Sequence, residues 1–128
     1  MSVKRFTLAE ANSVLNIIRP VVAEIQSIRE RILARQPELW PAMERAGGNG
    51  GSAELSRLAH EFDRLDSLVH EIVDTGAEIK DLGIGLIDFR ALRDDQEVYL
   101  CWKYGEEDIR YWHEIGAGVA GRRPIELF

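Results

Sequence analysis

The sequence lacks several features that would assign the protein to a functional class. It contains a single cysteine, which excludes a disulfide within the chain and is compatible with a reducing compartment. No apolar run approaches the roughly 20 residues that a membrane-spanning helix needs. The opening segment, residues 1–12, has no apolar core of the kind found in signal peptides. A cytoplasmic location without membrane association is therefore expected.

Signature motifs of known chemistry are also missing. The sequence has no HExxH, no CxxC and no P-loop. Basic residues are not in excess, because 22 acidic residues outnumber 16 basic ones and give a net charge of −6. Nucleic-acid binding depends on neutralising phosphates, so no nucleic-acid partner is expected. The acidic half, residues 61–128, can instead attract cations, including metal ions.

The composition that is present fits one globular domain. A hydrophobic fraction of 45% and a charged fraction of 30% separate the chain from disordered proteins. We expect an α+β fold in a single domain over residues 1–128. A long antiparallel helical hairpin, about residues 7–75, is followed by a small three-stranded antiparallel β-meander with a tail, about residues 77–128.

The first predicted helix has both a start signal and an apolar stripe. Thr7 and Glu10 fit a capping box, in which each side chain bonds the backbone of the other. Apolar residues then recur every three or four positions, at Leu8, Ala11, Leu15, Ile18, Val22, Ile25, Ile28 and Ile32. Pro20 lies inside this pattern, and a proline kinks a helix. Because the stripe keeps its phase, we predict one bent helix over about residues 8–36.

A second helix follows an interrupted segment. Pro37, Pro41 and the glycines among residues 47–51 are strong helix breakers. Ser52 then caps a helix that ends at Thr75–Gly76. Its apolar stripe consists of Leu55, Leu58, Phe62, Leu65, Val69 and Ile72. Two helices joined by a loop predict a hairpin. Two stripes bury only a narrow seam, so a third surface must come from the rest of the chain or from a second copy. A homodimer is expected, because the helical stripes can complete a four-helix arrangement.

The C-terminal part has strand composition. The predicted strands cover residues 85–89, 97–102 and 108–114, with a short helix as the alternative for the last. A polar connection over residues 90–96 has Asp94–Asp95 as its turn. The simplest registers pair Phe89 with Glu97 and Lys103 with Asp108. Side chains alternate between sheet faces, so Leu86, Asp88, Val98, Leu100, Trp102, Ile109, Tyr111 and His113 would share one face and Ile87, Phe89, Tyr99, Cys101, Lys103, Arg110 and Trp112 the other.

This register puts Asp88 and His113 on the same face, on either side of Val98. The two are candidate catalytic residues, because histidine titrates near neutral pH and a carboxylate can fix its tautomer. Together with Glu114 they are also candidate ligands of a divalent metal ion. A half-buried histidine bonded to backbone or carboxylate is the structural alternative. A slip of one residue in either register would break the grouping.

Four further residues are candidates for binding a small-molecule ligand. They are Trp102, Glu106, Trp112 and Arg122. The aromatic rings would supply an apolar wall, and the charged groups would supply polar contacts. Arg122 follows the glycine-rich segment GAGVAG, where it can clamp an anion or pair with the acidic meander. Cys101 is either a nucleophile with a histidine base or a buried small hydrophobe.

A weaker metal-binding pattern lies on the second helix. The pattern comprises Asp63, Asp66, His70 and Asp74. Spacings of three and four place these side chains on one helix face, where carboxylates and histidine can bind metal. The apolar stripe lies elsewhere on the same helix, so a solvated face is the alternative interpretation.

Several C-terminal motifs resemble a known family. They are Lys80–Asp81, Gly85–Leu86, Asp88–Phe89, Leu100–Cys101–Trp102, Gly105–Glu106, Trp112–His113–Glu114 and Gly121–Arg122. With the opening FTLAEANSVLNIIRPVV, they resemble a family of short bacterial proteins catalogued as domain of unknown function 2203. The resemblance covers nearly the whole chain and implies a bacterial, cytoplasmic setting, but it supplies no reaction. We expect a small ligand- or metal-binding module, and the alternative is a non-catalytic homo-oligomeric interaction protein whose meander is a structural cap.

Overall fold

The structure is a computed structural model that describes residues 4–35 and 53–127. Its helices are α1 (Leu8–Ala34) and α3 (Ala53–Val73), with short 3-10 helices η1 (Val119–Gly121) and η2 (Ile125–Leu127). Its strands are β1 (Glu78–Asp81), β2 (Leu86–Arg93), β3 (Gln96–Lys103), β4 (Tyr111–Glu114) and β5 (Arg123–Pro124). The predicted α+β class is confirmed. Within the described residues, no helix combines the length and apolar character that crossing a membrane requires.

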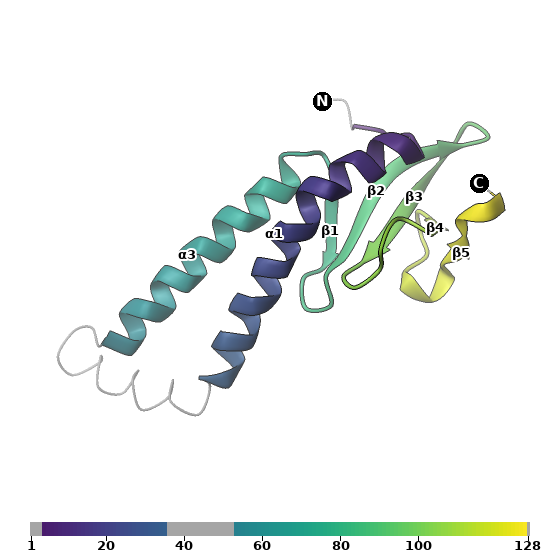
Figure 1. Cartoon of the computed structure of the whole chain (residues 1–128). Coiled ribbons are helices and arrows are strands. Elements are labelled where there is room, and N and C mark those ends of the chain that lie inside the picture. Colours follow the sequence, from purple (N-terminus) through teal and green to yellow (C-terminus); the bar gives the residue numbers. More distant parts are fainter. Residues whose placement is uncertain (1–3, 36–52, 128) are drawn as a thin grey trace.

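Helix α1 follows the predicted pattern closely. Thr7 Oγ1 accepts from the Glu10 backbone N–H at 3.1 Å, and Glu10 Oε1 accepts from the Thr7 N–H at 2.8 Å, which completes the capping box. The helix continues through Pro20 and changes direction along its length, as Figure 1 shows. Its buried residues are Ala11, Leu15, Ile18, Val22, Ile25 and Ile28. The three-four spacing therefore identified the face that enters the core.

Helix α3 lies beside α1 (Figure 1) and is less buried than its sequence pattern predicted. Leu68 and Ile72 are buried, whereas Phe62 is half exposed. Ion pairs join the two helices at their surface, including Arg64 with Glu24 at 2.6 Å. Because α3 packs mainly against α1, only a narrow strip of its surface is buried. The predicted connecting loop and Ser52 cap lie outside the described residues, so the hairpin itself stays a prediction.

The sheet has five antiparallel strands in the order β1-β2-β3-β4-β5, so the prediction of three strands is wrong. Strand β1 was missed because EIKD is mostly polar and half exposed. Strand β5 was missed because it has only two residues, one of them Pro124. A bulge between Ile79 and Asp81 interrupts the pairing of β1 with β2. The two unpredicted strands form the two edges of the sheet.

The predicted strand registers are also wrong. Phe89 pairs with Leu100 rather than with Glu97, a difference of three residues. The cause is the tight turn at Asp94–Asp95, whose φ angles of 51° and 65° place both residues in the left-handed region. A two-residue turn of this kind brings Arg93 opposite Gln96, so residues 90–93 extend β2 instead of forming a connection. Strands β3 and β4 are offset by one residue from the prediction, with Val98 opposite Glu114.

One face of the sheet forms the core with α1 and α3. The sheet contributes Ile87, Phe89, Ala91, Val98, Leu100, Trp102 and Trp112 to this cluster. Phe6 closes it at one end, with its ring edge-on to Phe89 at a centroid distance of 5.3 Å. Asn12 on α1 accepts from the Ile109 backbone N–H at 3.0 Å and so ties the helix to the segment before β4. The opposite face carries the polar residues.

That polar face is partly covered by the chain that follows β4. Arg122 reaches back to Glu106, with its Nη2 2.6 Å from Oε1, and its guanidinium lies over the Tyr111 ring at 4.0 Å. Ala117 and Gly118 border a pocket on this face. We call residues 115–122 the covering segment. It explains how residues on the face away from the helices are nevertheless buried.

The turn between β2 and β3 supports a stability prediction. Asp95 has a left-handed φ of 65°, a conformation that costs a non-glycine residue about 1–2 kcal/mol. We expect Asp95→Gly to raise the free energy of unfolding by about 1 kcal/mol, as measured by chemical denaturation. Asp95→Ala is the control, because alanine removes the charge without relieving the backbone. A gain in stability with alanine equal to that with glycine would contradict the conformational explanation.

Candidate functional site

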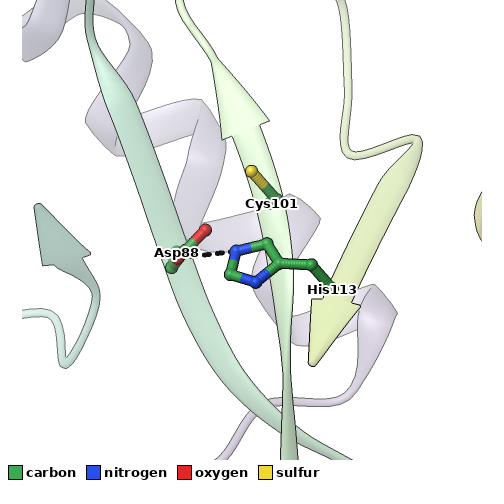
Figure 2. A group of neighbouring side chains, drawn as sticks. All are labelled: Asp88, Cys101 and His113. Carbon is green, nitrogen blue, oxygen red and sulfur yellow. Dashed lines mark hydrogen bonds and ion pairs between the residues drawn. The ribbon is translucent and has the colours of Figure 1, made fainter. Parts of the chain in front are cut away.

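Three neighbouring strands bring Asp88, Cys101 and His113 together on the polar face of the sheet (Figure 2). Asp88 lies directly opposite Cys101 in the β2–β3 pairing, and His113 lies opposite Tyr99 in the β3–β4 pairing. The potential ligand atoms of the three side chains all lie within 4.8 Å of one another. Asp88 and Cys101 are 0% exposed and His113 is 2% exposed. We call these three residues the buried triad.

The expected meeting of Asp88 and His113 is observed, although the pairing that predicted it is wrong. His113 Nε2 lies 2.9 Å from Asp88 Oδ2. Each predicted register was wrong by an odd number of residues, and an odd shift moves a side chain to the other face. The two errors cancel for Asp88 and His113 but not for Cys101. The prediction that Cys101 faces away from His113 is therefore wrong.

The backbone of Glu114 fixes the orientation of the histidine ring. His113 Nδ1 lies 2.8 Å from the Glu114 carbonyl oxygen. A carbonyl oxygen only accepts hydrogen bonds, so Nδ1 carries a proton and donates it. In the neutral imidazole, Nε2 then has the free lone pair, and this lone pair points at Asp88. Fixing one ring nitrogen with a backbone carbonyl is the usual way in which proteins orient a metal-binding histidine.

A proton must lie between Asp88 and His113. Nδ1 already carries one proton, so the 2.9 Å contact at Nε2 requires either a protonated carboxyl that donates or an imidazolium that donates to a carboxylate. Burial raises the pKa of Asp88, and the opposing effects of His113, Cys101 and Lys80 do not cancel it. In both forms the pair has zero net charge, which suits a buried site. The second oxygen, Asp88 Oδ1, is buried without a hydrogen-bond partner in the described part of the chain.

The environment of Cys101 opposes a role as a nucleophile. Burial, followed by the charge of Asp88, raises the pKa of its thiol to about 12. The sulfur is therefore a neutral thiol at neutral pH, whereas a nucleophile must be a thiolate. Binding to a metal ion removes this obstacle, because a coordinated thiol loses its proton. The thiol therefore fits a metal ligand better than a nucleophile.

Tyr99 and its charged neighbours surround the triad on the side of β1. The Tyr99 ring lies 5.4 Å from the His113 ring between centroids, and its hydroxyl donates to Glu78 Oε1 at 3.0 Å. Arg90 Nη2 donates to the same hydroxyl at 2.7 Å. Lys80 Nζ lies over the Tyr99 ring at 4.2 Å. The sequence interpretation did not name these residues as part of the site, although the correct register would have placed Tyr99 beside His113.

A pocket of about 250 Å³ opens next to the triad. Asp88 and His113 form part of its wall, together with Tyr99 and Leu86. Lys80 and the covering segment complete it. The triad is therefore closed toward the core and borders a small cavity on the outer face of the sheet.

The two tryptophans that were candidate ligand-binding residues lie on the other face of the sheet. Trp102 is 0% exposed and Trp112 is 4% exposed, and both belong to the core beneath the helices. Trp102 Nε1 donates to the Glu106 carbonyl oxygen at 2.8 Å, and Trp102 also borders a separate surface hollow with Arg19 and Tyr104. The predicted sharing of a face by Trp102 and His113 is wrong, because the β3–β4 register differs by one residue.

The other predicted site residues, Glu106, Glu114 and Arg122, lie near the triad, but their side chains are not part of it. The Glu114 side chain is exposed and pairs with Arg123 at 3.3 Å, so only its backbone serves the triad. Glu106 accepts from the Lys103 backbone N–H at 2.8 Å and pairs with Arg122. Arg122 therefore follows the alternative in which it pairs with the acidic meander. Its role in ligand binding stays a prediction.

The carboxylate–histidine pattern on α3 forms no such cluster. His70 Nδ1 bonds the Asp66 backbone carbonyl at 2.8 Å, and both side chains are mostly exposed. Among the described residues, the group of three potential ligands that converges is the buried triad. The solvated-face interpretation of α3 therefore describes the structure better.

The raised pKa of Asp88 gives a prediction about stability and pH. Since the folded pKa exceeds the unfolded value of about 3.9, the contribution of Asp88 is fully present below about pH 4 and is lost as the pH rises through the folded pKa. Asp88→Asn keeps a donor to His113 Nε2 but does not titrate. We expect the free energy of unfolding of the wild type to fall relative to that of Asp88→Asn, by up to about 1.4 kcal/mol per pH unit between the two pKa values.

Denaturation of metal-free protein from about pH 4 to about pH 9 would measure this difference. Asp63→Asn is the matched control, because Asp63 is exposed on α3. Parallel stability curves for the wild type and Asp88→Asn would show that burial does not shift the titration of Asp88.

Comparison with known proteins gives one match. Neither the curated proteins nor the solved structures that were searched contain a match to the chain. The model of the family described as an uncharacterized conserved protein, DUF2203, matches residues 4–125. That match spans both helices and the whole sheet, so it includes every residue of the buried triad. The chain therefore belongs to the DUF2203 family.

Proposed function

We propose that this protein is a small cytoplasmic module that binds one divalent transition-metal ion. The ligands are the Asp88 carboxylate, the Cys101 thiolate and His113 Nε2. The observation that carries the proposal is the convergence of these three buried donors within 4.8 Å. The buried Oδ1 oxygen of Asp88, which has no hydrogen-bond partner within the usual geometric limits in the described chain, also fits a metal ligand.

The donor types favour zinc over magnesium or calcium. A thiolate and an imidazole suit Zn²⁺ and related borderline metals, whereas Mg²⁺ and Ca²⁺ prefer sites made of oxygen ligands. In a tetrahedral zinc site, nitrogen and oxygen ligands are about 3.3 Å apart at the usual bond lengths. The 2.9 Å hydrogen bond between His113 and Asp88 would therefore lengthen by a few tenths of an ångström as the metal replaces the proton.

Charge balance also supports a divalent ion. In the metal-free triad, one proton is shared by Asp88 and His113 and a second is on the Cys101 thiol. A divalent cation that replaces both protons binds a carboxylate, a thiolate and a neutral imidazole, so the net charge of the triad stays at zero. Metal binding commonly releases protons from its ligands in this way. The exchange avoids the large cost of burying net charge.

Metal binding by untagged protein is the first test. We expect one Zn²⁺ per chain in competition with a chromophoric chelator. Asp88→Asn and Cys101→Ala should each weaken binding by more than about 100-fold, because loss of a ligand should exceed the usual effect of losing a residue that only orients one. With Co²⁺, the wild type should show a thiolate-to-cobalt charge-transfer band in the near ultraviolet, and Cys101→Ala should lack it.

His70→Gln is the matched control, because it removes the exposed histidine of α3 and leaves the triad intact. Circular dichroism would show that each variant is folded, which is expected for Asp88→Asn because the amide still donates to His113. Unchanged zinc affinity in Cys101→Ala, or loss of binding in His70→Gln, would refute the assignment to the triad.

A second candidate function, interaction through a homodimer, has its own structural support. An apolar groove of about 290 Å³ lies where α1, α3 and the turn after β1 meet. Phe62 is 50% exposed there and Leu33 is 42% exposed, and exposed apolar groups of this size often mark interaction sites. This face would be the contact between the helices of two copies.

Sedimentation over a range of concentrations tests the homodimer. We expect the wild type to form dimers and Phe62→Gln to weaken the association at least about tenfold, because buried aromatic residues often dominate such interfaces. Ile17→Gln is the control, since Ile17 is 63% exposed and lies outside the groove. A wild type that remains monomeric at every concentration would contradict the dimer.

A further inference from the structure

The pocket beside the triad has the features of a site for a small ligand. It encloses about 250 Å³, below the usual range for drug-sized ligands, and is lined on one side by Asp88 and His113. Leu86 and Ile115 give it an apolar wall, and Lys80 also lines it. The triad supplies three protein ligands, and zinc sites with three protein ligands keep a position for an exchangeable group. Since two triad residues line the pocket, that position would face the pocket.

Lys80 lines this pocket, and its ammonium group has hydrogen-bond donors that its neighbours do not occupy. Its ammonium pairs with Glu78 Oε1 at 3.1 Å and lies over the Tyr99 ring. An ammonium has three donors, so this pairing leaves hydrogen-bonding capacity for a ligand. The Lys80 side chain is 35% exposed, and the residue lines the pocket. The lysine is therefore oriented by its neighbours and still accessible.

The charged network around Lys80 has an excess of positive charge. Glu78 pairs with both Lys80 and Arg90, and Glu97 pairs with both Arg90 and Arg5. Three cations thus share two carboxylates, and Lys80 is the member of this network that lines the pocket. A divalent ion held by Asp88, Cys101 and His113 adds no net charge, because a carboxylate and a thiolate balance it. The local charge then favours a ligand with one negative charge.

We propose that this pocket binds a small monocarboxylate with a short apolar chain. One carboxylate oxygen coordinates the metal ion, the other accepts from Lys80, and the chain packs against Leu86 and Ile115. A carboxylate suits both partners, because it binds zinc and accepts charge-assisted hydrogen bonds. This inference rests on the proposed metal site.

Cobalt-substituted protein tests the inference with butyrate as the probe. We expect butyrate to change the visible d–d bands of bound Co²⁺, and to do so at lower concentration than acetate, which lacks the apolar chain. Butyramide, a neutral molecule of the same shape, should leave the bands unchanged. Lys80→Gln should keep the spectrum of bound Co²⁺ but raise the butyrate concentration needed by about tenfold or more, because it removes a charge-assisted hydrogen bond. Lys4→Gln is the control, since it removes an exposed lysine outside the pocket.

The outcomes separate this inference from the proposed function. Failure of Co²⁺ to bind with a thiolate charge-transfer band would overturn both. A normal cobalt spectrum that butyrate does not change would overturn the carboxylate site and leave the metal site standing. Equal butyrate binding in wild type and Lys80→Gln would refute the role of the lysine, and an equal response to butyramide would show that charge is not recognised.

Discussion

The two-residue turn at Asp94–Asp95 determines the composition of both faces of the sheet. It brings Arg93 opposite Gln96, and every later pairing between β2 and β3 follows from that contact. In this register, Phe89 and Trp102 point into the core and Asp88 and Cys101 point away from it. A shift of one residue would put a carboxylate beneath the helices and an aromatic ring on the outer face. The position of the buried triad therefore depends on a turn at the far end of β2.

The triad is deeply buried and has zero net charge. Its burial is tolerated because no net charge has to leave water. A lone carboxylate at the position of Asp88 would be costly, because the side chain is buried. The shared proton with His113 and the protonated thiol of Cys101 remove that cost. The Glu114 carbonyl fixes which nitrogen of His113 faces the carboxyl. Polar groups are thus arranged in the interior without a net buried charge, and protons can leave if a divalent ion enters.

Local patterns in the sequence predicted more than long-range ones did. The capping box at Thr7 and the apolar stripe of α1 were recovered because both depend on residues three or four apart. Strands β1 and β5 were not, because pairing with neighbours, rather than their own composition, makes them strands. Asp88 and His113 were expected to meet, and their side chains do lie 2.9 Å apart. Cys101 was placed on the wrong face, although a register counted from the Asp94–Asp95 turn would have put it opposite Asp88.

The two unpredicted strands, β1 and β5, form the exposed edges of the sheet. An exposed strand edge offers unpaired backbone groups to other chains and so invites aggregation. Strand β5 blunts its edge with Pro124, which has no N–H to donate, and β1 blunts the other with a bulge after Ile79 and charged side chains. Strand-to-strand growth into fibres or sheet-mediated oligomers is therefore disfavoured at both borders.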